Sequence, residues 1–299
     1  MLRLGAITDE VSPRVERALD MIRAWGVQDV EVHTAWDKNV ESLSDAQVSR
    51  LCHLLDERGL RVCCISSTAF LRCHLDGRDE PITWRTRFRS IRGGYADHVR
   101  ALARGLEIAR ALRAPLVRVF GFWRDGPTTD DVYQRAAERL AKPVEAAQAA
   151  GIGLALENCP HTYFDWSERA ARLVDQIDSP WLGLLWDPCS GMRAGENDYL
   201  SGYHHFQRRV MHVHAKDMRV DTALKRGRAY VPIGQGDIDW RAILARLVDS
   251  GYAGVVSLET YHLAADGTKE TAAAASFEGL SQLWRGVAAQ PIPEHERVG

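Results

Sequence analysis

Short apolar runs alternate along the chain with longer segments in which apolar residues recur at helical spacing. The short runs are typical of β-strands, and the longer segments are typical of helices that cover a sheet. The predicted strands are Leu4–Thr8, Val30–His33, Val62–Ser66, Leu116–Phe120, Ile152–Leu156, Leu182–Trp186, Val210–Val213 and Val255–Leu258. The predicted helices are Pro13–Trp25, Ser44–Arg58, Tyr95–Leu112, Asp130–Ala150, Ser167–Ile177, Asp198–Arg209, Trp240–Ser250 and Lys269–Ala288.

Eight strands that are each followed by a helix indicate a parallel sheet, and eight such units close into a (β/α)8 TIM barrel. An open doubly wound sheet is the alternative, but no GxGxxG motif follows the first strand, so a dinucleotide-binding fold is disfavoured. We therefore expect an α/β protein with a single barrel domain over residues 1–289. Residues 290–299 are expected to form a loosely ordered C-terminal tail.

Charge, hydropathy and cysteine spacing indicate which kinds of partner and which cellular compartment to expect. The formal net charge is −2 and no block of like charge stands out, so we expect no nucleic-acid partner, because phosphate binding needs clustered Lys and Arg. No apolar run approaches the ~18 residues of a membrane span, so no membrane partner is expected either. The six cysteines form no CxxC pair, and no export signal is evident. These observations favour reduced thiols in a cytoplasmic protein, with a homo-oligomer left open.

Three carboxylates and one imidazole stand at the C-terminal ends of four successive predicted strands. They are Glu157, Asp187, His214 and Glu259. Side chains alternate between the two faces of a strand, so Glu157 shares a face with the small Ala155, and Glu259 shares one with Ser257. We therefore place both glutamates on the inward face of the barrel, at the end where TIM barrels carry their chemistry.

Converging carboxylates repel one another, and a divalent cation would offset that repulsion. Oxygen-rich ligation with one imidazole favours Mn²⁺ or Mg²⁺, with Co²⁺, Fe²⁺ or Zn²⁺ as substitutes. The simpler interpretation is that each residue is a separate polar cap at a strand end. Four such residues on consecutive strands favour a shared metal site over that interpretation.

The chain resembles the xylose isomerase-like TIM barrels, a superfamily of sugar isomerases and epimerases that also includes inosose dehydratases, 3-dehydroshikimate dehydratases and endonuclease IV. The matching pieces are Leu156-Glu157-Asn158, Trp186-Asp187-Pro188, Val210-Met211-His212-Val213-His214-Ala215-Lys216-Asp217, Gly234-Gln235-Gly236-Asp237-Ile238-Asp239-Trp240 and Ser257-Leu258-Glu259. These pieces are characteristic of the family and do not distinguish one reaction within it.

The resemblance implies metal ligation by Glu157, Asp187, His214 and Glu259. It also implies that Glu157 and Glu259 act as an acid–base pair, which would isomerise or epimerise a small sugar, keto-sugar or cyclitol through a metal-stabilised cis-enediolate. One alternative is a lyase that uses the same enediolate to dehydrate a keto-inositol or 3-dehydroshikimate, or to cleave a 3-keto-glycoside. Another is a non-catalytic sugar-binding barrel, which the intact ligand set argues against.

The sequence departs from its relatives near these motifs. Cys159 stands where many relatives have histidine, although His161 could compensate, and Ser190 and Tyr163 replace residues typical of ketose 3-epimerases. A ketohexose 3-epimerase is therefore disfavoured. Endonuclease IV binds three metals through many more histidines, so a DNA-repair role is disfavoured as well.

Further residues are predicted to contact the substrate. Lys216 follows His214 by two positions and should face the pocket, where it could hold a substrate oxygen or serve as an acid. His33, Arg118, His161 and His212 are also assigned as substrate-binding candidates, with His212 one layer deeper than His214. Arg118 is expected to pair with Glu31 or Glu157 inside the barrel.

Overall fold

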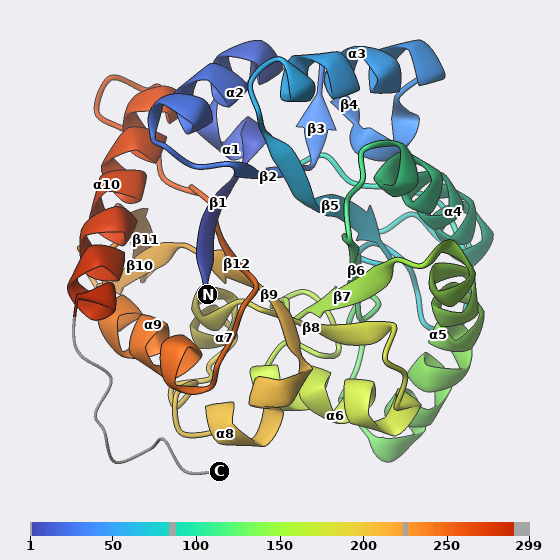
Figure 1. Ribbon diagram of the computed structural model, residues 1–299. Coiled ribbons are helices and arrows are strands. Elements are labelled where there is room, and N and C mark those ends of the chain that lie inside the picture. The colour runs from blue at the N-terminus through green and yellow to red at the C-terminus, as the bar shows by residue number, and fades with distance from the viewer. Residues whose placement is uncertain (1, 84–87, 224–226, 290–299) are drawn as a thin grey trace, which may run out of the picture.

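A computed structural model describes residues 2–83, 88–223 and 227–289 of the chain. Eight parallel strands close into a barrel in the order β1-β12-β9-β8-β7-β6-β5-β2 (Figure 1). The strands are β1 (Arg3–Ile7), β2 (Asp29–Val32), β5 (Arg61–Ala69), β6 (Leu116–Phe120), β7 (Gly153–Glu157), β8 (Leu182–Trp186), β9 (Val210–Ala215) and β12 (Val255–Leu258). The predicted (β/α)8 barrel is confirmed, and the predicted tail at 290–299 lies outside the described residues.

Helices form an outer ring around the strands (Figure 1). The longer ones are α2 (Val15–Ala24), α3 (Asp45–Asp56), α4 (Tyr95–Ala111), α5 (Asp130–Ala150), α6 (Ser167–Ile177), α9 (Trp240–Asp249) and α10 (Lys269–Ala288). Their ends follow local sequence signals. Ser44 and Gln47 form a capping box at the start of α3, and Gly151 ends α5 with a left-handed φ of 69°, a conformation that costs glycine little.

One face of each barrel strand packs against the helices in the apolar core, and the other face points into the more polar interior of the barrel. Leu154 and Leu156 of β7 are fully buried in the main apolar cluster, which also contains side chains of the surrounding helices. The alternate positions of the same strand are Ala155 and Glu157. Ala155 is in register with Arg118 of β6 on one side and Gly183 of β8 on the other, so two small residues in a row lie beside the long Arg118 side chain. This arrangement leaves room for charged groups at the C-terminal end of the barrel.

Short elements at the strand ends differ from the predicted pattern. The predicted helix Asp198–Arg209 is wrong, because only α8 (Tyr203–Phe206) and the 3-10 turn η2 (Gln207–Arg209) form in that region. Asp198 instead accepts the Ser201 backbone N–H at 3.3 Å, a local bond that competes with helix formation.

Several short elements near the strand ends were not predicted. They are α1 (Thr8–Val11), α7 (Pro188–Arg193), the 3-10 turn η1 (Val40–Ser42) and the strand pairs β3 (Thr34–Ala35) with β4 (Lys38–Asn39) and β10 (Asp217–Val220) with β11 (Arg228–Val231). Within the described ranges, no helix has the length and apolar character needed to cross a membrane.

Candidate functional site

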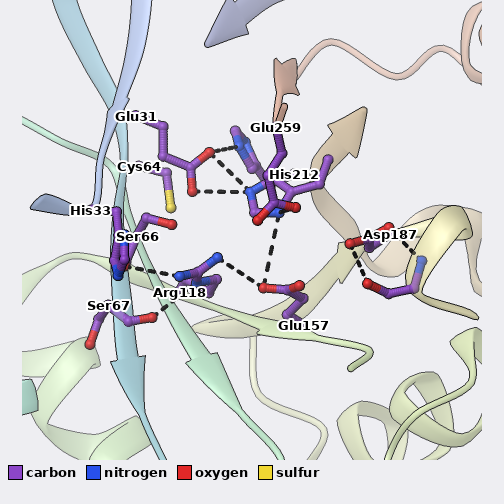
Figure 2. Close-up of polar contacts among 12 residues, drawn as sticks. Glu31, His33, Cys64, Ser66, Ser67, Arg118, Glu157, Asp187, His212 and Glu259 are labelled. Carbon is purple, nitrogen blue, oxygen red and sulfur yellow. Dashed lines mark hydrogen bonds and ion pairs between the residues drawn. The ribbon is translucent and has the colours of Figure 1, made fainter. Parts of the chain in front are cut away.

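Four buried residues bring their ligand atoms together at the C-terminal end of the barrel. Glu157 ends β7, Asp187 follows β8, His214 lies on β9 and Glu259 follows β12. One carboxylate oxygen or ring nitrogen from each lies within 4.8 Å of the corresponding atom of every other. Nδ1 of His214 is 3.3 Å from a Glu259 oxygen and 4.0 Å from a Glu157 oxygen. Figure 2 shows the three carboxylates converging.

The His214 ring is held from behind by a fourth carboxylate. Nε2 of His214 is 3.1 Å from both oxygens of Glu31, and Nε2 of His212 is 2.8 Å from one of them. Because Glu31 accepts the Nε2 proton, the ring directs Nδ1 toward Glu157, Asp187 and Glu259. Nδ1 is fully buried, has no well-aligned hydrogen bond with any described residue, and faces the Glu259 carboxylate as an ion pair at 3.3 Å. A carboxylate behind one ring nitrogen, with the other nitrogen directed at further ligand groups, is typical of metal-binding histidines.

Without a metal, protons and protein cations balance these carboxylates. Burial lowers the pKa of His214, but Glu31 and Glu259 outweigh burial and raise it to about 10. A metal at Nδ1 would displace that proton. Burial raises the pKa of Glu157 to about 7 against the opposing effects of Arg118 and His214. Burial also acts to raise the pKa of Glu259, but Lys216 and His214 outweigh it and hold that pKa well below its usual range.

Two buried cations contact the candidate ligands directly. The Lys216 ammonium pairs with Asp187 and Glu259, and it lies 4.8 Å from the centre of the Tyr261 ring. The Arg118 guanidinium donates to Glu157 at 3.0 Å, so the expected pair forms with Glu157 and not with Glu31 (Figure 2). Arg118 also donates to the backbone carbonyls of Ser67 and Ser66, at 2.9 and 3.1 Å, which fixes its direction.

Asp187 is positioned by a local network. Its carboxylate caps α7, accepting the Ser190 backbone N–H at 2.8 Å and the Ser190 hydroxyl at 2.7 Å. The Asn158 side chain binds the Asp187 backbone at both N–H and carbonyl, at 2.8 and 2.9 Å. Ser190, one of the departures noted in the sequence, therefore orients the Asp187 carboxylate, and Asn158 fixes the backbone beneath it.

A cavity of about 450 Å³ opens above this set. Glu157, Glu259 and Ser190 line it, together with apolar and aromatic side chains and several cations. The apolar and aromatic lining comprises Leu71, Phe88, Phe120, Cys159, Pro160, Ala229, Tyr230 and Tyr261, and the basic lining comprises Arg118, His161, Arg193, Lys216 and Arg228. The volume suits a small metabolite.

The sequence-predicted substrate contacts divide into two groups. Arg118, His161 and Lys216 line the cavity, whereas His33 and His212 do not. His33 Nδ1 is 3.0 Å from Asp9, its Nε2 is 3.1 Å from the Arg89 carbonyl, and Phe88 stacks on its ring. With both nitrogens engaged by protein, the structure does not favour His33 as a substrate contact. His212 binds Glu31 behind the ligand set, which favours a supporting role.

Several residues of this site were not predicted from the sequence. The sequence predicts Glu31 only as a partner for Arg118, although His212 and His214 share one face of β9 and can reach the same carboxylate. Arg193, Arg228 and Tyr230 were not singled out. For Arg193 a signal exists, because Asp187-Pro188 is a good N-cap and N1 pair and marks the start of the helix that carries it.

Comparisons with known proteins agree with this architecture. The chain is 28% identical over 144 residues to the inosose dehydratase of Lacticaseibacillus casei, an alignment that covers 44% of this chain and 48% of that protein. It is 25% identical over 228 residues to the putative L-ribulose-5-phosphate 3-epimerase SgbU of Escherichia coli K12, covering 73% and 72% of the two chains. The first alignment thus spans about half the length of that relative.

Solved structures share the fold. The IOLI protein with a bound zinc atom superposes with a TM-score of 0.75 at 17% identity, covering 96% of this chain and all of that one. A xylose isomerase-like TIM barrel protein of Mycobacterium smegmatis in complex with magnesium gives a TM-score of 0.70 at 18% identity, covering 95% and 97%. The family described as xylose isomerase-like TIM barrel matches residues 19–283. The chain therefore belongs to the xylose isomerase-like TIM barrel family.

Proposed function

We propose that this protein is a divalent-metal-dependent enzyme that removes a proton next to the carbonyl of a small polyhydroxy compound. The observation that carries the proposal is the buried set of Glu157, Asp187, His214 and Glu259 beneath a cavity, with Nδ1 of His214 directed at the carboxylates. These four residues would hold the metal, whose Lewis acidity would polarise the substrate carbonyl and acidify the neighbouring C–H. Related proteins with zinc and magnesium support a divalent ion without fixing which one.

Isomerisation or epimerisation is the leading outcome. Glu157 on β7 and Glu259 after β12 both line the cavity, and β8 and β9 lie between them in the barrel. One carboxylate would take the proton from one side of the substrate, and the other would return a proton from a different side. Each has its own cationic partner, Arg118 for Glu157 and Lys216 for Glu259, which favours the ionised form that a base requires.

A dehydratase is the second candidate, supported by the similarity to inosose dehydratases and by the position of Lys216. Lys216 lines the cavity beside Glu259 and could donate a proton to a departing hydroxyl. Removal of the α-proton is common to both reactions, so the two differ only in what happens after it.

The decisive experiment follows deuterium from solvent into substrate. Metal-loaded protein is incubated in D2O with a panel of keto-sugars and keto-cyclitols, and the recovered compounds are analysed by mass spectrometry. Deuterium uptake with otherwise unchanged mass is expected for an epimerase, and loss of one water for a dehydratase. Exchange should stop after EDTA treatment and return on adding Mn²⁺ or Mg²⁺, so exchange that survives removal of the metal would contradict the proposal.

Two substitutions test the acid–base roles. Glu157→Gln and Glu259→Gln should each abolish turnover, because an amide cannot accept the proton. The exposed Glu57→Gln is the matched control and should leave turnover unchanged. A wild-type rate of deuterium exchange in Glu157→Gln or Glu259→Gln would show that the substituted glutamate is not the acid or base.

A further inference from the structure

Four side chains with fixed positive charge line the cavity, and two of them are paired with carboxylates among the described residues. Arg118 pairs with Glu157, and Lys216 pairs with Asp187 and Glu259. In the described parts of the chain, neither Arg193 nor Arg228 forms an ion pair with a carboxylate, although both line the same cavity. The cavity therefore carries positive charge beyond what its own carboxylates require.

Arg193 is held by neutral groups. Its guanidinium is 3.3 Å from the Tyr230 hydroxyl and 3.2 Å from Nε2 of His161. Burial, with Arg193 next in effect, lowers the pKa of His161 to about 4, and burial raises the pKa of Tyr230, so both partners are uncharged near neutral pH. They fix the direction of the guanidinium without neutralising it. An arginine held this way retains donors for an anion.

Arg228 reaches the cavity from a different element. It begins β11, where it is in register with Val220 of β10. The Asp217 carboxylate at the start of β10 accepts backbone N–H groups of Gly234, Gly236 and Ile238 at 2.9, 3.0 and 3.2 Å. These bonds fix the start of β10 to the segment that leads into α9, and at the other end of β10 the Val220 backbone N–H, opposite Arg228, donates to the Asp237 carboxylate of that segment at 2.6 Å.

We propose that Arg193 and Arg228 form a subsite for an oxyanion, and that the substrate is a polyhydroxy carbonyl compound carrying a carboxylate or a phosphate. This inference rests on the proposed function. Asp187 is the N-cap of α7 and Arg193 is its last residue, and the helical rise of roughly 1.5 Å per residue puts their Cα atoms about 9 Å apart. The anionic group would therefore bind at the end of the substrate remote from the reacting carbon.

Matched pairs of ligands test the subsite by calorimetry on metal-loaded protein. D-fructose 6-phosphate is compared with D-fructose, and D-glucuronate with D-glucose, so that each pair differs in one oxyanion. The anionic member of at least one pair should bind about tenfold more tightly or better, and which pair shows the gap distinguishes phosphate from carboxylate. Equal affinities within both pairs would overturn the proposal.

Variants assign the preference to these two arginines. Arg193→Gln and the exposed Arg228→Gln should each reduce the gap to about threefold or less, while affinity for the neutral sugar stays the same. Arg124→Gln is the matched control, because Arg124 lies near His161 but pairs with Asp165 and does not line the cavity. A loss of preference in Arg124→Gln equal to that in Arg193→Gln would show a general charge effect and contradict the subsite.

The same titrations on EDTA-treated protein separate this inference from the proposed function. If the arginines form the subsite, the anion preference persists without metal and depends on Arg193, even if deuterium exchange is never found. If deuterium exchange occurs but no anion preference exists in either state, the proposed function stands and the subsite is wrong.

Discussion

Nε2 of His214 lies 3.1 Å from both carboxylate oxygens of Glu31, on the side of the ring away from the candidate ligands. The two residues come from β9 and β2, which are not neighbours in the barrel, so the contact crosses its interior. Glu31 is fully buried, and its contacts with His212 and His214 outweigh burial and hold its pKa well below the usual range. An ionised carboxylate behind the ring favours a metal on the opposite nitrogen.

Glu31 should therefore control metal affinity without touching the metal. Glu31→Ala is expected to weaken Mn²⁺ binding about 10- to 100-fold, and Glu31→Gln by less, because the amide oxygen can still accept the ring N–H. Calorimetric titration with Mn²⁺ measures both. Glu196→Gln is the control, since Glu196 is also a buried acid but binds Ser167. An unchanged Mn²⁺ affinity of Glu31→Ala would show that Glu31 does not support the candidate metal site.

The buried pair of Arg118 and Glu157 should behave as a coupled unit. Arg118→Met leaves Glu157 without its partner and should lower the free energy of unfolding of the metal-free protein by about 3–5 kcal/mol. In the Arg118→Met/Glu157→Gln double variant the loss should be smaller than the sum of the single losses, because the uncompensated charge is gone. Urea unfolding measures all four proteins. Strictly additive losses would mean that the two side chains do not interact.

Lys216 should compete with the metal, because its ammonium contacts Asp187 and Glu259, two of the four candidate ligands. Lys216→Met is expected to destabilise the metal-free protein, since Asp187 and Glu259 lose their shared cation, and to tighten Mn²⁺ binding by about tenfold. Thermal unfolding with and without Mn²⁺ should show a larger metal-induced shift than in wild type. Lys269→Met removes a lysine that pairs with Glu10 instead and serves as the control. Weaker Mn²⁺ binding in Lys216→Met would make Lys216 a partner of the metal rather than its competitor.

His98 should contribute to the pH dependence of stability. It is fully buried on α4 and accepts the backbone N–H of Phe70, just beyond β5, at 2.9 Å. Burial lowers its pKa from 6.5 to about 4. Between those values the unfolded chain binds a proton that the folded chain does not, so this contribution to stability is fully present above about pH 6.5 and is lost as the pH falls through about 4.

His98→Asn keeps an acceptor for Phe70 and removes the titrating ring. Its free energy of unfolding should fall less steeply than that of wild type between about pH 6.5 and 4, by at most about 1.4 kcal/mol per pH unit. Urea unfolding across this range measures the difference, with the exposed His53→Asn as the control. Parallel curves for wild type and His98→Asn would show that His98 does not titrate in this way.

Much of the fold was predictable because it depends on local periodicity. The apolar runs gave the barrel strands, and alternation of faces placed Glu157 and Glu259 on the same side as Ala155 and Ser257. In a parallel barrel the C-terminal ends of all strands lie at the same end of the barrel. Residues that follow four of these strands therefore lie close together, as the four candidate ligands do.

The remaining features depend on contacts that periodicity does not encode. Arg118 could have reached Glu31 or Glu157, and the choice follows from the Ser66 and Ser67 carbonyls that direct it. Arg193 and Arg228 lie on short elements after β8 and β9, whose course is set by side-chain anchors such as Asp217. The domain boundary, a cytoplasmic location, the oligomeric state and the absence of a nucleic-acid partner stay predictions.

The six-residue helix α7 begins directly after the Asp187 carboxylate and ends at Arg193. A residue inserted into or deleted from this helix would move Arg193 relative to the candidate metal ligands while leaving β8, and hence Asp187, in place. If Arg193 binds one end of the substrate as proposed, the length of compound that the cavity accepts can change in evolution independently of the proposed reaction at the carbonyl. Divergence in this one helix gives a barrel of this kind a simple route to new substrates with unchanged chemistry.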